Sequence, residues 1–138
     1  MGIVKALPTL EAWMESRGLA WKLLSDREYR TCRSSWSNTF QQRIERRWQH
    51  VQGTRAILDF ESELPCSVFL ICGISIPEVG NLGGPCASGY RIDNCHSLNV
   101  ELCSSLELVV IDTDYRWCIL LSHETSSGGM CHPEFWRS

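Results

Sequence analysis

Apolar residues recur every three or four positions through much of the first 51 residues, which is the spacing of a helix that buries one face. The longest such run extends from Asp26 to Val51 and carries arginine and glutamine on its other side. Its apolar positions are Tyr29, Cys32, Trp36, Phe40, Ile44, Trp48 and Val51. We therefore predict a helix about 39 Å long over 26–51, with Ser34-Ser35 as a candidate break and Gly53 as its end.

Shorter patterns lie on both sides of this run. Residues 8–17 carry a helical stripe after Pro8-Thr9, which offers an N-cap, and Gly18 follows as a C-terminal glycine. Residues 19–23 alternate apolar and polar side chains, which favours a strand. Residues 55–61 contain no helix breaker, so we predict a short helix there that Pro65 prevents from continuing.

The second half of the chain predicts the sheet. Residues 66–72 are apolar on both alternating faces, which indicates a central strand covered on both sides, with the long helix as one cover. The stretch 106–124 holds two apolar runs around Asp-Thr-Asp-Tyr and predicts a β-hairpin with strands near 106–112 and 116–122. Residues 73–97 predict a long connection with room for one short strand, and 97–105 a helical turn.

These elements predict an α+β fold, in which an antiparallel sheet has the N-terminal helices packed mainly on one face. After a glycine-rich loop, we expect the aromatic pair Phe135-Trp136 to pack back on this sheet. With 138 residues, 43% of them hydrophobic, the chain can enclose a core without metal or disulfide staples. We therefore expect a single domain over 1–138.

Charge is unevenly distributed. Residues 1–55 hold ten Lys/Arg and five Asp/Glu, whereas 56–138 hold three and eleven, which leaves a net charge of −3. Such polarity either steers a charged partner toward one face or reflects two solvated faces of one domain. The net negative charge argues against a dedicated nucleic-acid binder. The chain shows neither a secretion signal nor an apolar run long enough to span a bilayer. We therefore expect a cytoplasmic protein that does not enter membranes.

Eight cysteines are unusual for this length, and an even number would fit disulfides in an exported protein. Without an export signal, we expect reduced thiols, most of them in the core. Cys66, Cys72 and Cys118 lie inside apolar strand patterns, where a thiol acts as a small hydrophobic group.

Four residues near the carboxyl end could carry chemistry. His123, Glu124, Cys131 and His132 offer ligands that suit zinc, and a cysteine activated by a histidine would be a nucleophile. The same thiol chemistry could use Cys86 or His96. Their spacing matches no zinc finger or metalloprotease motif, so we predict no metal and no cofactor, and favour structural roles.

Two charged clusters have simpler interpretations. Asp112 and Asp114 are separated by one residue, as paired catalytic carboxylates sometimes are, but turn chemistry explains them better because Asp accepts backbone N–H groups in tight connections. Arg43, Arg46 and Arg47 beside a tryptophan could grip phosphates, yet at helical spacing they are more simply a solvated flank.

Scattered motifs resemble a family of small bacterial proteins of unknown function. The resemblance rests on Trp36-Ser-Asn-Thr-Phe40, on Ile111-Asp112-Thr-Asp-Tyr115-Arg-Trp117, and on Ser122-His123-Glu124, and spans residues 19–136. This chain has tyrosine at 115 where the family has phenylalanine, and serine at 122 where it has threonine. The resemblance implies a compact cytoplasmic α+β domain without established catalytic residues, similar in size and setting to immunity proteins that neutralise toxins.

These observations favour a non-enzymatic protein-binding module, with a bacterial toxin domain as the more specific partner. We expect the acidic half and residues 73–97 to supply steering and contacts. The binding residues predicted around the hairpin are Asp112, Asp114, Tyr115, Trp117, His123 and Glu124. The alternative is a small metal- or thiol-dependent hydrolase that uses His123, Glu124, Cys131 and His132. The sequence leaves the oligomeric state open.

Overall fold

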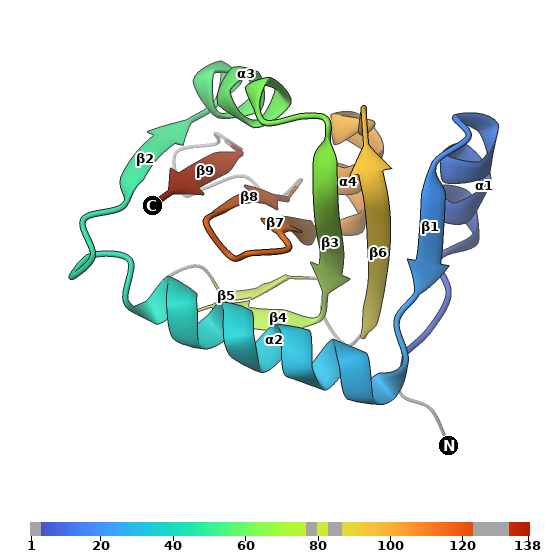
Figure 1. Cartoon of the computed structure of the whole chain (residues 1–138), viewed down its shortest axis with the longest axis horizontal. Helices are drawn as coiled ribbons and strands as arrows, with labels where there is room; N and C mark the ends of the chain where they lie inside the picture. Colours follow the sequence, from blue (N-terminus) through green and yellow to red (C-terminus); the bar gives the residue numbers. More distant parts are fainter. Residues whose placement is uncertain (1–3, 77–79, 83–86, 123–132) are drawn as a thin grey trace.

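The computed structural model describes residues 4–76, 80–82, 87–122 and 133–138, and these contain helices on both faces of a sheet (Figure 1). The helices are α1 (Pro8–Ser16), α2 (Asp26–Gln41), α3 (Thr54–Ser62) and α4 (Val100–Leu106). The strands are β1 (Ala20–Leu23), β2 (Gln49–Gln52), β3 (Cys66–Cys72), β4 (Ile74–Ile76), β5 (Gly80–Leu82), β6 (Ser88–Cys95), β7 (Leu108–Asp112), β8 (Trp117–Leu121) and β9 (Glu134–Arg137).

The main sheet is antiparallel, with strand order β1-β6-β3-β7-β8-β9-β2, while β4 and β5 pair with each other. The predicted central strand is β3, whose Val68 faces a residue of β6 on one side and of β7 on the other. The predicted hairpin is β7 and β8, which pair from Leu108 opposite Leu121 to Ile111 opposite Cys118. The predicted α+β class with an antiparallel sheet is therefore confirmed.

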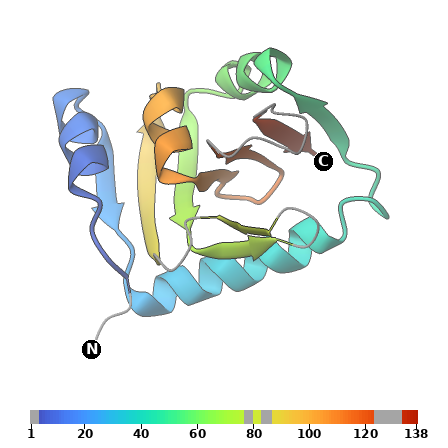
Figure 2. The ribbon, with the colours of Figure 1, turned by 180° about the vertical axis from the view of Figure 1, so that it is seen from behind.

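Side chains along the central strands alternate between two cores. Val68, Leu70 and Val110 belong to a core covered by α1, α3 and α4, which we call the α1 face. Ile71 and Val109 belong to a second core covered by α2, which we call the α2 face. Three of the four helices thus lie on one face, and the long helix covers β3 from the other, as predicted. Seen from behind, α1 and α4 lie in front of the sheet (Figure 2).

The amino end of α2 is fixed by a capping box. The Ser25 side chain accepts a hydrogen bond from the Glu28 backbone N–H, and the Glu28 carboxylate accepts one from the Ser25 backbone N–H. Both bonds satisfy donors that the first helical turn leaves without intrahelical partners. The buried residues of α2 are those of the predicted apolar stripe up to Phe40, and the helix continues without a break through Ser34-Ser35.

The carboxyl end of α2 corrects the prediction of a helix over 26–51. The helix ends at Gln41, a turn follows, and residues 49–52 form β2, in which Val51 pairs with Phe135 of β9. Arg47 has a φ of 57°, and Ile44 is 68% exposed instead of lying on the buried stripe. Pairing of β2 with the last strand therefore outweighs a local periodicity that is fully compatible with helix, because tertiary contacts override intrinsic propensity.

Strand β6 corrects the prediction of a long connection over 73–97. Its residues Tyr90 and Ile92 are buried on the α1 face, and it pairs with both β1 and β3. Gly89 explains part of the weak sequence signal. A Cβ at this position would lie 3.0 Å from side-chain atoms of Ile71 and Leu24 and 3.1 Å from Tyr29, so the close packing favours glycine here.

The shorter predictions agree with the structure. Helices α1 and α3, strand β1 and the helical turn that became α4 all lie where the patterns place them, and Phe135 and Trp136 pack on the two faces as part of β9. The exception is the start of α1, where Leu7 is the N-cap and makes no side-chain cap bond. Among the described helices, none combines the length and apolar character needed to cross a bilayer.

Candidate functional site

The turn of the β7–β8 hairpin shows that Asp112 has a structural role. Its side chain is 3% exposed, and Oδ2 accepts hydrogen bonds from the Arg116 backbone N–H (3.3 Å) and Nε (2.9 Å). Its carbonyl oxygen accepts from the backbone N–H of Tyr115 at 2.8 Å. The turn chemistry predicted for Asp112 is therefore confirmed, and its consequence is to fix the backbone at Tyr115.

Two other predicted binding residues of the hairpin differ in burial. Trp117 is 3% exposed and packs its ring against Phe60 and Phe135, with both centroid distances 5.7 Å, so it belongs to the α1-face core. Asp114 is exposed, and its carboxylate lies 3.6 Å from Arg116 Nη2. The remaining predicted binding residues, His123 and Glu124, lie outside the described residues.

The residues of the hydrolase alternative cannot be placed, because 123–132 and Cys86 lie outside the described residues. His96 is exposed. Within the described ranges, no group of three or more His, Cys, Asp and Glu side chains could hold a metal ion. A histidine–carboxylate pair, His50 Nε2 at 2.8 Å from Glu134 Oε1, stands at the β2–β9 edge, but the adjoining cavity of about 20 Å³ has room for little more than one water.

The cysteines that the structure describes are free thiols, and five of the six are buried. Burial raises the pKa of Cys66 and Cys95 to about 11, and of Cys103 and Cys118 to about 12. The prediction of free core thiols is confirmed for the five buried positions, while Cys66 is only half-buried. Because the thiolate is the nucleophilic form, none of these four is poised for catalysis at neutral pH.

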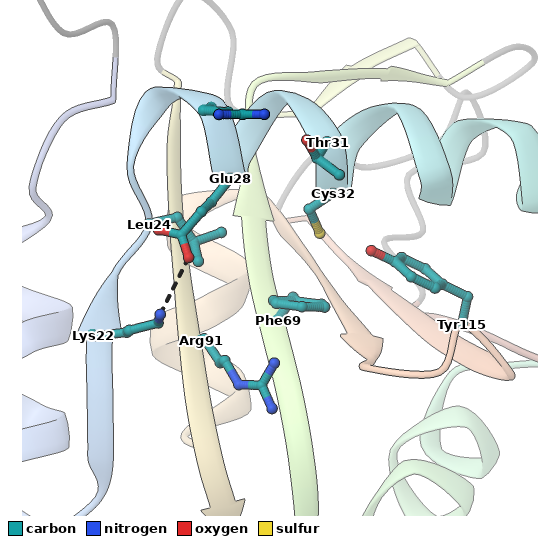
Figure 3. Close-up of a pocket in the computed structure, with 9 residues that line it drawn as sticks. Lys22, Leu24, Glu28, Thr31, Cys32, Phe69, Arg91 and Tyr115 are labelled. Atoms are coloured by element: carbon teal, nitrogen blue, oxygen red, sulfur yellow. Dashed lines mark hydrogen bonds and ion pairs between the residues drawn. The ribbon is translucent and has the colours of Figure 1, made fainter.

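Tyr115 lines a pocket on the α2 face (Figure 3). This aromatic pocket has a volume of about 290 Å³ and lies between α2, three strands and the hairpin turn. It is lined by Lys22, Leu24, Arg27, Glu28, Thr31, Cys32, Phe69, Arg91 and Tyr115.

The floor of the aromatic pocket is built by strand register. Arg91 of β6 lies opposite Lys22 of β1 on one side and opposite Phe69 of β3 on the other. The three side chains therefore form one row across the sheet. Two cations lie directly opposite each other in this row, and each has a carboxylate partner, Glu28 for Lys22 at 3.2 Å and Asp93 for Arg91 at 2.9 Å.

Two aromatic rings meet at the end of this row. The rings of Phe69 and Tyr115 are stacked, with centroids 6.1 Å apart and planes 28° from parallel. The guanidinium of Arg91 lies over the Phe69 ring, 5.6 Å from its centroid. Tyr115 is held at a φ of 57°, a conformation that costs a non-glycine residue about 1–3 kcal/mol and is found preferentially at functional sites.

Helix α2 forms the wall of the pocket. Thr31 and Cys32 project from it beside the Tyr115 ring, and Glu28 reaches toward β1, where its Oε2 lies 3.2 Å from Lys22 Nζ (Figure 3). Hydrogen bonds from Ser25 and Lys22 lower the pKa of Glu28, so this carboxylate is ionised at neutral pH. Arg27 makes no ion pair with any residue in the described ranges.

The pocket presents binding groups and no nucleophile. Burial raises the pKa of Cys32 to about 11, against a smaller opposing effect of its hydrogen bond with Tyr115. Burial also raises the pKa of Tyr115 above its ordinary value. The thiol and the phenol are therefore both neutral near pH 7, and the charged groups of the pocket are three cations and one carboxylate.

The solvent side of α2 extends this positive surface. Arg30 and Arg33 line a shallow depression of about 430 Å³ together with Ser34, Ser37 and Asn38. We call these five residues the arginine face. Neither arginine forms an ion pair within the part of the chain that the structure describes, and Arg27 lies one turn before Arg30 on the same helix.

Arg43 corrects the interpretation of the second arginine cluster as a solvated flank. It is 5% exposed, its Nη1 donates to the Phe40 carbonyl at 3.0 Å, and its guanidinium lies 4.1 Å from the Phe40 ring centroid and 4.9 Å from that of Trp136. This residue therefore stabilises the α2-face core, while Arg46 and Arg47 remain exposed in the turn after α2.

Sequence reasoning found Tyr115 but missed Lys22, Phe69 and Arg91 as site residues. The alternation of residues 19–23 does place Lys22 on the opposite side from Trp21, and Phe69 lies on the less buried face of β3. Their convergence depends on β6 lying between β1 and β3, which no local pattern encodes.

Comparisons with known proteins give no family for this chain. The sequence matches no protein-family model, and neither a curated protein nor a solved structure is significantly similar to it. The functional argument therefore depends on the site itself.

Proposed function

We propose that this chain is a non-enzymatic protein-binding module that contacts an acidic surface of a partner through the aromatic pocket and the arginine face. The observation that carries the proposal is the unneutralised positive charge of α2. Arg27, Arg30 and Arg33 point to no carboxylate of the described chain, although the protein as a whole carries a net charge of −3.

Electrostatic complementarity supports a partner of opposite charge. Like charges one turn apart on a helix destabilise it slightly, so a row of unpaired arginines is stabilised by carboxylates that come from outside. Such a surface accelerates association and rejects basic partners more than it adds raw affinity. The sequence expectation placed steering on the acidic half, whereas the described cavities favour the basic half.

The chemistry of the pocket supports binding over catalysis. Its thiol and phenol are protonated at neutral pH, and its one carboxylate is paired with Lys22. Arginine and aromatic side chains, by contrast, are the residues most enriched at the energetic centres of protein interfaces.

The more specific proposal is that the partner is a toxin domain. It is supported by the hairpin and α2 motifs that resemble a family of small bacterial proteins of unknown function, whose size and setting are similar to those of immunity proteins. Neutralising a toxin requires a rigid surface that covers the toxin's active site, not chemistry on the binder's side. A rigid sheet with a helix seated on it meets that requirement.

The test uses the double variant R30E/R33E and the control R46E/R55E, which changes net charge by the same amount on exposed residues away from both surfaces. The protein encoded next to this chain is expressed in a bacterial host, alone and with each variant. We expect growth arrest that wild type and control relieve, a stable complex in gel filtration, and affinity at least about tenfold weaker for R30E/R33E.

Two results would contradict the proposal. Equal protection by both double variants would show that the arginine face makes no contact. A salt-sensitive shift of duplex DNA or RNA that R30E/R33E abolishes, without any protein complex, would assign the surface to nucleic acid instead.

A further inference from the structure

We propose that the aromatic pocket is an anchor site for one aromatic side chain of the partner, with carboxylates adjacent to that side chain in the partner's sequence. This inference rests on the proposed function and deepens it, because it states what enters the pocket.

The size of the pocket limits the occupant. Its volume of about 290 Å³ lies at the lower edge of the range of about 300–1,000 Å³ found for pockets that enclose drug-sized ligands. A cavity of this size between a helix and a sheet accommodates a single large side chain. Aromatic anchors that fill such pockets carry much of the energy of protein interfaces.

The floor selects an aromatic ring. Phe69 and Tyr115 already form an offset stack, and a third ring can extend it in the offset or edge-to-face geometry that aromatic pairs prefer. Cys32, which is neutral because burial raises its pKa, adds a polarisable apolar side chain beside the Tyr115 ring.

The rim selects carboxylates beside the ring. Lys22, Arg27 and Arg91 surround the opening, and only Glu28 opposes them within the pocket. Arg91 donates its Nε to Asp93 at 2.9 Å, while its guanidinium carbon lies 5.6 Å from the Phe69 ring centroid. An aromatic side chain flanked by acidic residues therefore matches both the aromatic floor and the positively charged rim of the pocket.

The experiment compares two peptides, Ac-Glu-Glu-Tyr-Glu-Glu-NH2 and Ac-Glu-Glu-Ala-Glu-Glu-NH2, by NMR titration of the ¹⁵N-labelled full chain. We expect the tyrosine peptide to bind at least about tenfold more tightly, with the largest shifts at the backbone amides of Phe69, Arg91 and Tyr115. Thr31→Trp, which fills the pocket from an exposed position on α2, should remove this preference. Leu58→Trp, at a 58% exposed position of α3 on the opposite face of the sheet, should keep it.

Each remaining outcome separates the anchor from the proposed function. Equal affinity for both peptides, lowered in R30E/R33E, would overturn the anchor and leave the acidic partner standing. Binding of neither peptide at about 5 mM would overturn the anchor, while the co-expression and gel-filtration test would still decide the proposed function. Tighter binding of phenyl phosphate than of the tyrosine peptide, with shifts at the same amides, would make the pocket a site for a free aromatic anion and overturn the anchor.

Discussion

Gly89 is the position where the seating of α2 on the sheet can be tested by one methyl group. A Cβ there would lie 3.0 Å from Ile71 Cδ1, 3.0 Å from Leu24 Cδ1 and 3.1 Å from Tyr29 Cδ2. These atoms come from β3, from the connection before α2, and from α2 itself. Since carbon atoms pack at about 3.5–4.0 Å, Gly89→Ala requires these three side chains to move by a few tenths of an ångström.

The magnitude follows from overpacking. An extra methyl group in a well-packed core lowers the free energy of unfolding by about 1–3 kcal/mol. The lower conformational entropy of alanine in the unfolded chain raises it again by less than about 1 kcal/mol. We therefore expect a loss of about 1–2 kcal/mol. For 138 residues, at about 2.1 cal/mol/K of unfolding entropy per residue, this corresponds to a fall in Tm of about 3–7 °C.

The assay is urea unfolding followed by tryptophan fluorescence, with a double-mutant cycle as its control. Ile71→Val deletes the Cδ1 atom that the new methyl would meet, so the double variant should lose less stability than the sum of the single variants, by at least about 0.5 kcal/mol. Additive losses, or a Gly89→Ala variant as stable as wild type, would refute the described packing of Ile71, Leu24 and Tyr29 around Gly89.

Three further predictions address the helix cap, the pocket thiol and the core. Glu28→Gln should lower stability at pH 7. Because the pKa of Glu28 is lower in the folded state, this stability difference should disappear as pH falls from about 4.5 through the folded pKa. Urea midpoints measured at several pH values test this, and a pH-independent difference would contradict it. Burial raises the pKa of Cys32 to about 11, so this thiol should react with iodoacetamide at pH 8 at least about 100-fold more slowly than free cysteine. Peptide mass spectrometry measures this rate, and a rate comparable to that of free cysteine would show that the thiol is exposed. Trp117→Ala should destabilise the fold by about 3–5 kcal/mol because the ring fills the α1-face core, and a well-folded variant that only loses partner binding would instead support its predicted binding role.

Much of the sheet could be predicted from local patterns. The run 66–72 is apolar on both faces because β3 lies between two cores, and the apolar runs around Asp112 pair as the hairpin that their spacing indicates. Asp112 itself was correctly assigned to turn chemistry, since its hydrogen bonds are to Arg116 a few residues away. Local interactions of this kind leave their signal in adjacent sequence.

The features that local sequence patterns did not predict depend on contacts with residues far away in the chain. The helical spacing of Ile44, Trp48 and Val51 is genuine, but β2 pairs with β9 more than 80 residues later, and that pairing decides the local structure. Arg43 looked like a surface residue because its burial depends on Trp136 from the same distant strand. The row of Lys22, Arg91 and Phe69 exists only because β6 inserts between β1 and β3.

The most direct test of the account is hydrogen–deuterium exchange of the full chain, free and in complex with the protein encoded beside it. The account predicts that binding slows exchange in α2 over 26–38 and in the turn 112–117, and leaves α1 and α3 on the opposite face unchanged. Protection confined to α1 and α3, with α2 and the hairpin turn unaffected, would contradict the claim that the aromatic pocket and the arginine face form the contact surface.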